Sequence, residues 1–347
     1  MLTADLQKGA PSLLQLTLPE IGEWDKIAGF SYTNAKTDIK SMISAADYFS
    51  VNPAVGHTLE KLKSNKVFCY DVSENETYYS VYSCIYYELM HDKKFYILFS
   101  NSWFCVDPDF LDSINSSLKS VEESTLSFPD VQTYAVPKTG KKPKKSSKLS
   151  VEAEGAYNDR VSKACGYQLL DRKLIKPRTG ASSIELCDLL SNKGEFIHAK
   201  HKKGGSAGIS HLFAQGRIAA ELLLSDKEFR KGARAKLSKP TKSLVPLNKF
   251  DPSTSEIVFL VLGDKTSDVK NNLPFFSKVN LWVTYLSLSQ RNFKVSIAGA
   301  PLSPAASVPI SVPAAPIGMI PVSGAKPTVP VVHPSTTIPV GTTLSTP

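Results

Sequence analysis

The sequence predicts a mixed α and β protein built in two parts. Residues 1–136 are expected to form an α+β domain, and residues 150–299 an α/β domain whose mixed central sheet is flanked by helices. Aromatic and β-branched runs between polar turns indicate strands in the first part. In the second part, short apolar runs alternate with segments of helical spacing. A lysine-rich linker at 137–149 separates the two parts, and a proline-rich tail follows at 300–347.

The first part contains three strand-like runs, which are KSNKVFCYDV, TYYSVYSCIYYELM and KFYILFSNSWFCVD. Residues 91–94 (HDKK) lie between two of them and predict a hairpin turn. Asp107 and Pro108 open a run to Glu122 with apolar residues at helical spacing, so a helix is expected there. The many aromatic residues favour a packed core over a stacking platform.

The second part begins with a predicted helix at 151–163 and a strand at 167–170. Strands at 184–190 and 195–200 are joined by Ser-Asn-Lys-Gly, which predicts a hairpin.

Further along, a helix is expected at about 209–224, and Ser225 is the predicted N-cap of the next helix. Residues 256–263 (EIVFLVLG) are almost entirely apolar, as in a buried central strand. An apolar helix at 274–290 and a strand at 293–297 complete the domain.

The tail holds eleven of the 23 prolines and a single charged residue, Lys326. Proline lacks the N–H that helices and ladders need, so the tail is expected to be disordered or polyproline-like. A plain tail is favoured over a ligand for a proline-binding module.

The net charge of +9 is concentrated in one segment. Between Lys193 and Lys242 there are twelve basic and four acidic residues, which gives +8. Such segments attract polyanions, because phosphate contacts release counterions. A nucleic acid, DNA in the first place, is therefore the expected partner. The lysine run at 138–148 is interpreted as a solvated linker, which could also follow a nucleic-acid backbone. The predicted contact residues are Lys202, Lys203, Arg217, Lys227, Arg230, Lys231, Arg234 and Lys236.

Several classes of protein are excluded. No apolar run approaches the ~18–20 residues of a membrane span, and the first residues do not resemble a secretory signal. The five cysteines are scattered without a CxxC pair, which favours reduced thiols in the cytoplasm over disulfides or a zinc site. Nucleotide-binding glycine motifs and the GxSxG and HExxH motifs are missing.

The order of helix, strand, hairpin and helix in the second part resembles the restriction-endonuclease-like core of PD-(D/E)xK nucleases. That family carries an acid on one strand and an acid-x-Lys triplet on the next, whose first and third side chains share a face. Here Asp188 stands in the first position, and His198-Ala199-Lys200 stands in place of the triplet. Ten residues separate Asp188 from His198, a distance that a hairpin spans.

The resemblance implies a role for each polar residue. Asp171, Asp188 and His198 would be ligands of Mg²⁺ or Mn²⁺, and Glu154 on the leading helix would add a further ligand. Lys200 would lie near the attacking water or stabilise charge on the phosphate. Gln215 on the following helix would face the site.

His198 departs from the family pattern, because imidazole is a softer ligand for Mg²⁺ than a carboxylate. Simpler interpretations stay open. Asp188 could cap the turn, His198 could be a hydrogen-bonded interior residue, and Lys200 could be one phosphate contact among many. His211 and Gln215, four residues apart on a helix, could make a site together with His198 or form a satisfied polar seam.

Most of the chain, residues 15–298, is similar to a sporadically distributed prokaryotic family of uncharacterised function. The stretches that carry this resemblance are EGAYNDRV, LLDRKLI, SSIELCDLL, EFIHAKHKKGGSAGISHLFAQG and LPFFSKVNL. The resemblance implies a mobile-element or phage-defence setting. Members of that family are usually longer at the N-terminus, which implies a partial version here.

The sequence therefore predicts a metal-dependent DNA nuclease in prokaryotic defence. The alternative is a non-catalytic nucleic-acid-binding or scaffold protein of a defence system. Contacts with other defence proteins and a homo-oligomer are left open, and no membrane partner is expected.

Overall fold

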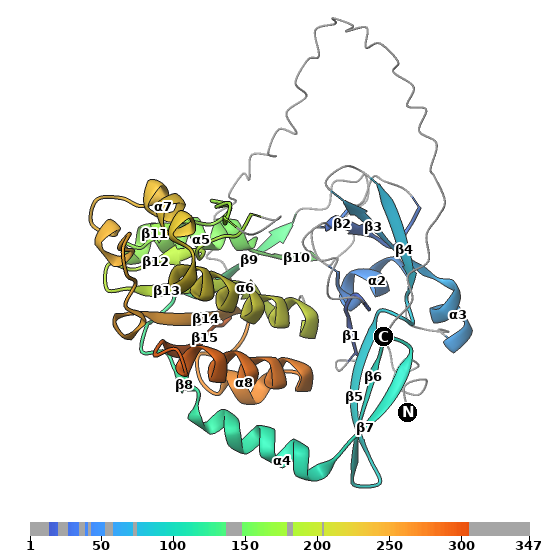
Figure 1. Ribbon diagram of the computed structural model, residues 1–347. Coiled ribbons are helices and arrows are strands. Elements are labelled where there is room, and N and C mark those ends of the chain that lie inside the picture. Colours follow the sequence, from blue (N-terminus) through green and yellow to red (C-terminus); the bar gives the residue numbers. More distant parts are fainter. Residues whose placement is uncertain are drawn as a thin grey trace, which may run out of the picture. The chain divides into compact units, whose positions relative to one another are not determined.

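The computed structural model describes residues 14–19, 27–34, 39–40, 43–52, 58–71, 75–136, 148–178, 183–202 and 205–304 (Figure 1). Within these residues the protein is a mixed α/β structure with several sheets and seven α-helices. All of them belong to one compact unit, Met1–Ala306. Most of the predicted linker and the tail beyond residue 304 lie outside the described residues.

Two antiparallel sheets form the first part of the chain. One has the order β2-β3-β4 and the other β1-β5-β6-β7. Their strands are β1 (Leu14–Leu16), β2 (Ile27–Ser31), β3 (Lys66–Asp71), β4 (Glu76–Ser80), β5 (Ile85–His91), β6 (Lys94–Phe99) and β7 (Ser102–Val106). The short helices α2 (Ala45–Val51) and α3 (Leu59–Ser64) contribute Tyr48 and Leu62 to their core. The predicted aromatic core is present there.

Tight turns divide the long predicted strand runs. At the expected hairpin, Asp92 and Lys93 have φ of 47° and 61°. Two consecutive residues with positive φ are what a type I′ turn requires, and the twist of this turn matches that of the flanking strands. Ser100 and Asn101 repeat this geometry with φ of 47° and 65°, and so separate β6 from β7. The predicted helix follows as α4 (Pro108–Ser117), and the Asp107 carboxylate accepts from its first-turn N–H groups.

A six-stranded mixed sheet with the order β11-β12-β13-β14-β15-β8 forms the centre of the second part (Figure 1). Its strands are β8 (Glu122–Glu123), β11 (Gln168–Leu169), β12 (Leu189–Leu190), β13 (Glu195–His201), β14 (Glu256–Leu262) and β15 (Lys294–Ala300). β13, β14, β15 and β8 run parallel to one another. β12 runs antiparallel to both of its neighbours, β11 and β13. β14 is the predicted buried central strand.

Helices cover both faces of this sheet. α6 (Gly205–Ser225) and α8 (Phe275–Ser289) pack on one face through residues such as Phe213 and Leu281. α5 (Glu154–Cys165) packs on the other face through Tyr157 and Val161. A side chain on Gly216 of α6 would meet the Phe259 ring at 2.5 Å, so glycine is what allows α6 to approach the sheet this closely.

The predicted N-cap of the helix after α6 is corrected by the structure. Ser225 is the last residue of α6, and its hydroxyl donates to Glu221. The N-cap of α7 (Lys227–Lys236) is Asp226, whose carboxylate accepts from the backbone N–H groups of Glu228 and Phe229 at 2.8 and 3.0 Å.

The prediction that residues beyond 299 form no ladder is also wrong for a short segment. β16 (Leu302–Pro304) pairs parallel to β9 (Val131–Val136), and β10 (Lys148–Val151) pairs on the other side of β9. β16 is an edge strand, the position in a sheet where proline is tolerated.

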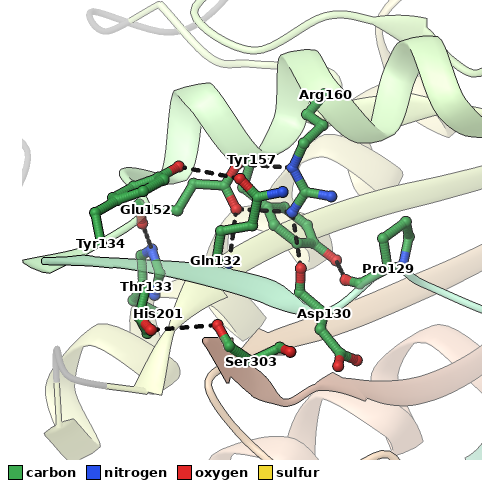
Figure 2. A network of polar contacts seen from close by, with 10 residues as sticks. All are labelled: Pro129, Asp130, Gln132, Thr133, Tyr134, Glu152, Tyr157, Arg160, His201 and Ser303. Atoms are coloured by element: carbon green, nitrogen blue, oxygen red, sulfur yellow. Dashed lines mark hydrogen bonds and ion pairs between the residues drawn. The ribbon is translucent and has the colours of Figure 1, made fainter. Parts of the chain in front are cut away.

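A buried carboxylate joins α5 to this small sheet (Figure 2). Glu152, only 3% exposed, receives two hydrogen bonds from the Arg160 guanidinium at 2.8 and 2.7 Å and one from the Gln132 backbone N–H at 3.0 Å. Arg160 also donates to the carbonyl of Asp130, and the Glu152 carbonyl lies 2.9 Å from His201 Nε2 on β13. The network therefore fixes the start of α5 against β9 and β13.

We predict that Arg160→Met destabilises the fold by about 3 kcal/mol, because it leaves the Glu152 charge buried without its ionic partner. Denaturant unfolding of the full chain measures the change. Lys163→Met is the matched control on the same helix. Its exposed pair with Asp159 is worth under about 1 kcal/mol, so equal losses for the two variants would contradict the prediction.

Candidate metal centre

Three ends of neighbouring strands meet at one edge of the six-stranded sheet. β12 runs antiparallel to both β11 and β13, so the start of β12 lies beside the ends of the other two. Asp171 follows β11 by two residues, Asp188 immediately precedes β12, and Lys200 is near the end of β13. The backbone N–H of Asp171 donates to the carbonyl of Asp188 at 3.0 Å. Topology thus brings together three residues that are far apart in sequence.

Carboxylate oxygens of Asp171, Glu185 and Asp188 lie within 4.8 Å of one another. Asp188 is 4% exposed, and the other two are partly buried. Among the described residues this is the one group of three or more His, Cys, Asp or Glu side chains with metal-ligand proximity. Asp171 and Asp188 were predicted as ligands, and Glu185 was not.

Glu185 was missed because the segment before β12 is not the strand that its composition suggested. In a strand, residues 185 and 188 would point to opposite faces. The ladder covers only Leu189–Leu190, and Ile184 makes an isolated bridge to Ile175. The irregular backbone between them turns both carboxylates the same way. The three-residue spacing of Glu185 and Asp188 in ELCD could have indicated this pair. It does so only if the segment is not assumed to be a strand.

Asp188 is held from two sides. Its Oδ2 accepts from the Ala199 backbone N–H at 2.8 Å, and its Oδ1 lies 3.5 Å from the Asn158 amide nitrogen. The carboxylate bonds across to the next strand rather than capping its own turn. Asn158 is fully buried, and its Oδ1 has no hydrogen-bond partner in the part of the chain that the structure describes. Asn158 therefore brings an unused oxygen to the cluster.

Asn158 and Glu154 lie one turn apart on α5 and approach the site from the helix side. Lys200 Nζ contacts Glu154 Oε1 at 3.1 Å, and both side chains are about three-quarters buried, being 30% and 24% exposed. The i, i+4 spacing of Glu154 and Asn158 in EGAYNDRV was the sequence signal for this shared face. The helix start that the Glu152 network fixes thus supplies two further polar groups.

The electrostatics of the cluster favour a cation. Burial, followed by the charge of Glu154, raises the pKa of Asp188 well above its usual value. Burial also raises the pKa of Asp171 and of Glu185, and in Glu185 the charge of Asp171 adds to the effect. The charge of Glu154 thus opposes ionisation of all three acids, and the charge of Asp171 opposes ionisation of Glu185 and Asp188. A divalent cation between them would reverse this effect.

Lys200 remains a cation in this setting. Burial acts to lower its pKa, but the charge of Glu154 and the hydrogen bond to it outweigh burial, so the pKa is raised. An ammonium with a raised pKa is poorly suited to accept a proton and well suited to stabilise negative charge. Gln215 of α6 closes the cluster from the third side, with its amide nitrogen 3.3 Å from Glu185 Oε2.

His198 is not brought to the cluster, contrary to its predicted role as a ligand. It shares the face of Lys200, but at about 3.3 Å per residue it lies roughly 6.6 Å deeper along β13. There its ring packs 6.2 Å from the Phe259 ring beneath α6. Neither ring nitrogen has a hydrogen-bond partner among the described residues, so the alternative of a hydrogen-bonded interior histidine is not observed either.

The predicted nucleic-acid contacts fall into two groups. Arg230 is 5% exposed and donates to the carbonyls of Leu223, Leu224, Leu247 and Asn248. Arg234 donates to the carbonyls of Lys242 and Val245. These two guanidinium groups tie α7 to the following loop, so they are structural rather than free for phosphate.

The lysines of α7 have the opposite character. Lys227, Lys231 and Lys236 are exposed, and Lys231 makes only a surface pair with Glu228 at 3.6 Å. Lys202 is paired with the buried Asp264 at 2.7 Å, Arg217 is partly buried, and Lys203 lies outside the described residues. Of the predicted contact residues that the structure describes, the exposed lysines of α7 are therefore the ones available to contact a phosphate backbone.

These features define a mixed α/β protein with a buried carboxylate cluster at a sheet edge. The chain belongs to a family of unknown function, DUF6119, which matches residues 1–301. The expectation of an uncharacterised family is confirmed to that extent. No curated protein and no solved structure matches the chain. In the described residues, none of the helices combines the length and apolar character needed to cross a bilayer.

We predict that His198→Met increases stability and flattens its acid dependence. Burial lowers the pKa of His198 to about 4, below its ordinary 6.5, so the folded state resists a proton that the unfolded chain accepts. Stability from this residue is complete above pH 6.5 and is lost as the pH falls toward 4, with a slope of up to about 1.4 kcal/mol per pH unit. Denaturant midpoints measured across this range test the difference, and parallel curves for parent and variant would refute it.

Proposed function

We propose that this protein is a metal-dependent phosphodiester hydrolase that acts on DNA, a nuclease of the PD-(D/E)xK kind. The observation that carries the proposal is the group of Asp171, Glu185 and Asp188 carboxylates with the Lys200 ammonium beside it. Lys200 contacts Glu154 at 3.1 Å, and the charges of Asp188 and Glu185 help to raise its pKa. Glu185, and not His198, supplies the carboxylate that the triplet lacks. A role in prokaryotic defence against phage or mobile DNA remains part of the proposal, and it rests on the family resemblance alone.

The donor set suits a hard divalent cation. All three clustered ligands are carboxylates, Glu154 is nearby, and Asn158 offers an amide oxygen. Mg²⁺ and Mn²⁺ prefer such oxygen ligands, whereas a zinc site would call for histidine or cysteine. When bound, such an ion supplies Lewis-acid stabilisation of the phosphate and lowers the pKa of water.

The protein's own residues have separable roles in this proposal. Lys200, held by Glu154, would present its charge to the phosphate and stabilise the negative charge that develops there. Gln215 and Asn158 would orient Glu185 and Asp188 through the contacts already described. The exposed lysines of α7 would hold the DNA backbone.

We predict that Asp188→Asn raises the melting temperature of the metal-free chain at pH 8 by about 3 °C or more. The raised pKa values mean that stability is greatest while these acids are protonated, near and below pH 4, and declines as the pH rises and they ionise. The asparagine still accepts from the Ala199 N–H, but it carries no charge.

Calorimetry with and without Mn²⁺ measures the effect. Mn²⁺ should raise the melting temperature of the parent, more at pH 8 than at pH 5, and leave Asp188→Asn unchanged. Asp159→Asn, at an exposed acid on α5, is the matched control and should respond like the parent. An equal Mn²⁺ response in Asp188→Asn would exclude a metal at this cluster.

We predict that the full chain cuts DNA in the presence of Mg²⁺ or Mn²⁺ and that Lys200→Met slows cutting by about 10²–10³-fold, the size typical for loss of one charge-stabilising group. Lys163→Met should cut at the parental rate. Gel assays on single- and double-stranded DNA, with melting curves to verify folding, provide the measurement. Equal rates for parent and Lys200→Met would contradict the assignment.

The alternative is a non-catalytic nucleic-acid-binding or scaffold protein, favoured by the absence of an acid at position 198. It predicts that the chain binds DNA but does not cut it, whichever divalent metal is added. Lys→Gln changes on α7 should weaken this binding, and Asp188→Asn should leave it unchanged.

A further inference from the structure

The loop at residues 171–178, here called the basic loop, leads directly out of the carboxylate cluster. It carries four cationic residues in eight, and all four are exposed, namely Arg172, Lys173, Lys176 and Arg178. Between these cations Leu174 is 54% exposed. Neither the exposed leucine nor this charge is required by the hydrolytic site itself.

The basic loop is anchored rather than loosely attached. Ile175 is 4% exposed and exchanges two backbone hydrogen bonds of 2.8 Å with Ile184. It packs so closely on α7 that a side chain on Gly232 would meet it at 2.6 Å. The Arg178 backbone N–H donates to Asp226 at 2.7 Å. These contacts fix the backbone after Leu174, whose side chain is exposed.

The loop is also joined to the cluster. Arg172 has φ of 60°, a left-handed conformation that is costly for a non-glycine residue. Its backbone makes a hydrogen bond to the Glu185 carboxyl, and Asp171 directly precedes it in the chain. The strained residue therefore couples the position of the loop to the position of two candidate ligands.

We propose that the basic loop grips duplex DNA by inserting Leu174 between base pairs while Lys176 contacts a backbone phosphate. This inference rests on the proposed function, and it names duplex DNA and the segment that deforms it. Single apolar side chains flanked by cations are the devices that open base steps from the minor groove. A membrane surface fits less well, because one leucine buries too little apolar area to hold a protein there.

The experiment uses the full chain with Asp188→Asn and without divalent metal, so that binding is measured without cutting. The probe is a duplex with the fluorescent base 2-aminopurine, whose emission rises when it is unstacked. The Asp188→Asn chain should bind and raise the emission. Adding Leu174→Ala should abolish the rise and weaken affinity by roughly ten-fold. Lys176→Gln should reduce the slope of log affinity against log salt by about 1.

Two further variants are matched controls, since Leu247 and Lys119 are exposed residues outside the basic loop. Leu247→Ala and Lys119→Gln should leave affinity and emission unchanged. The inference is overturned if Leu174→Ala retains the emission rise, or if the chain binds phosphatidylserine vesicles through Leu174 and does not bind the duplex. Leu174-dependent unstacking by a chain that never cuts DNA with Mg²⁺ or Mn²⁺ would support the loop assignment and refute the proposed cleavage.

Discussion

The ion pair between the buried Glu152 and the partly exposed Arg160 is the interaction on which the candidate site depends. Removing a carboxylate from water is unfavourable unless its oxygens are bonded, and here a bidentate guanidinium and a backbone N–H satisfy them. The pair sits at the start of α5, so its geometry sets where Glu154 and Asn158 meet the sheet edge. The polar network in Figure 2 therefore positions residues of the candidate site without contributing a ligand to it.

The cluster itself opposes folding. Burial raises the pKa of Asp171, Glu185 and Asp188, and the charge of Glu154 adds to the effect in all three. The charge of Asp171 adds to it further in Glu185 and Asp188. Lys200, the Ala199 N–H and the Asn158 amide offset part of this repulsion. Such locally unfavourable arrangements are typical of functional sites, because a structural core would have no reason to collect like charges.

Sequence patterns predicted the order of elements well where period and capping were strong, as in α4 and in β14. Asp171, Asp188, Lys200 and Gln215 were selected through the resemblance of the element order to the PD-(D/E)xK core. Sequence patterns failed where tertiary structure decides the outcome. The apparent strand before β12 is irregular, which concealed Glu185, and the depth of His198 under α6 depends on packing against Phe259. Composition likewise could not separate Arg230, which is used internally, from the exposed lysines around it.

The place of β8 in the six-stranded sheet has a consequence for how the chain folds. β8 pairs with β15, so Glu122 meets Ser296, and Leu302 of β16 meets Val131; each pair is separated by about half of the sequence. During synthesis, both partners of these ladders exist only after nearly all of the described chain has emerged. Pairings of such long sequence separation are slow to form, and they leave sheet edges exposed in the meantime. Completion of this sheet is therefore a late event, and the nascent chain passes through a stage at which it needs protection from aggregation.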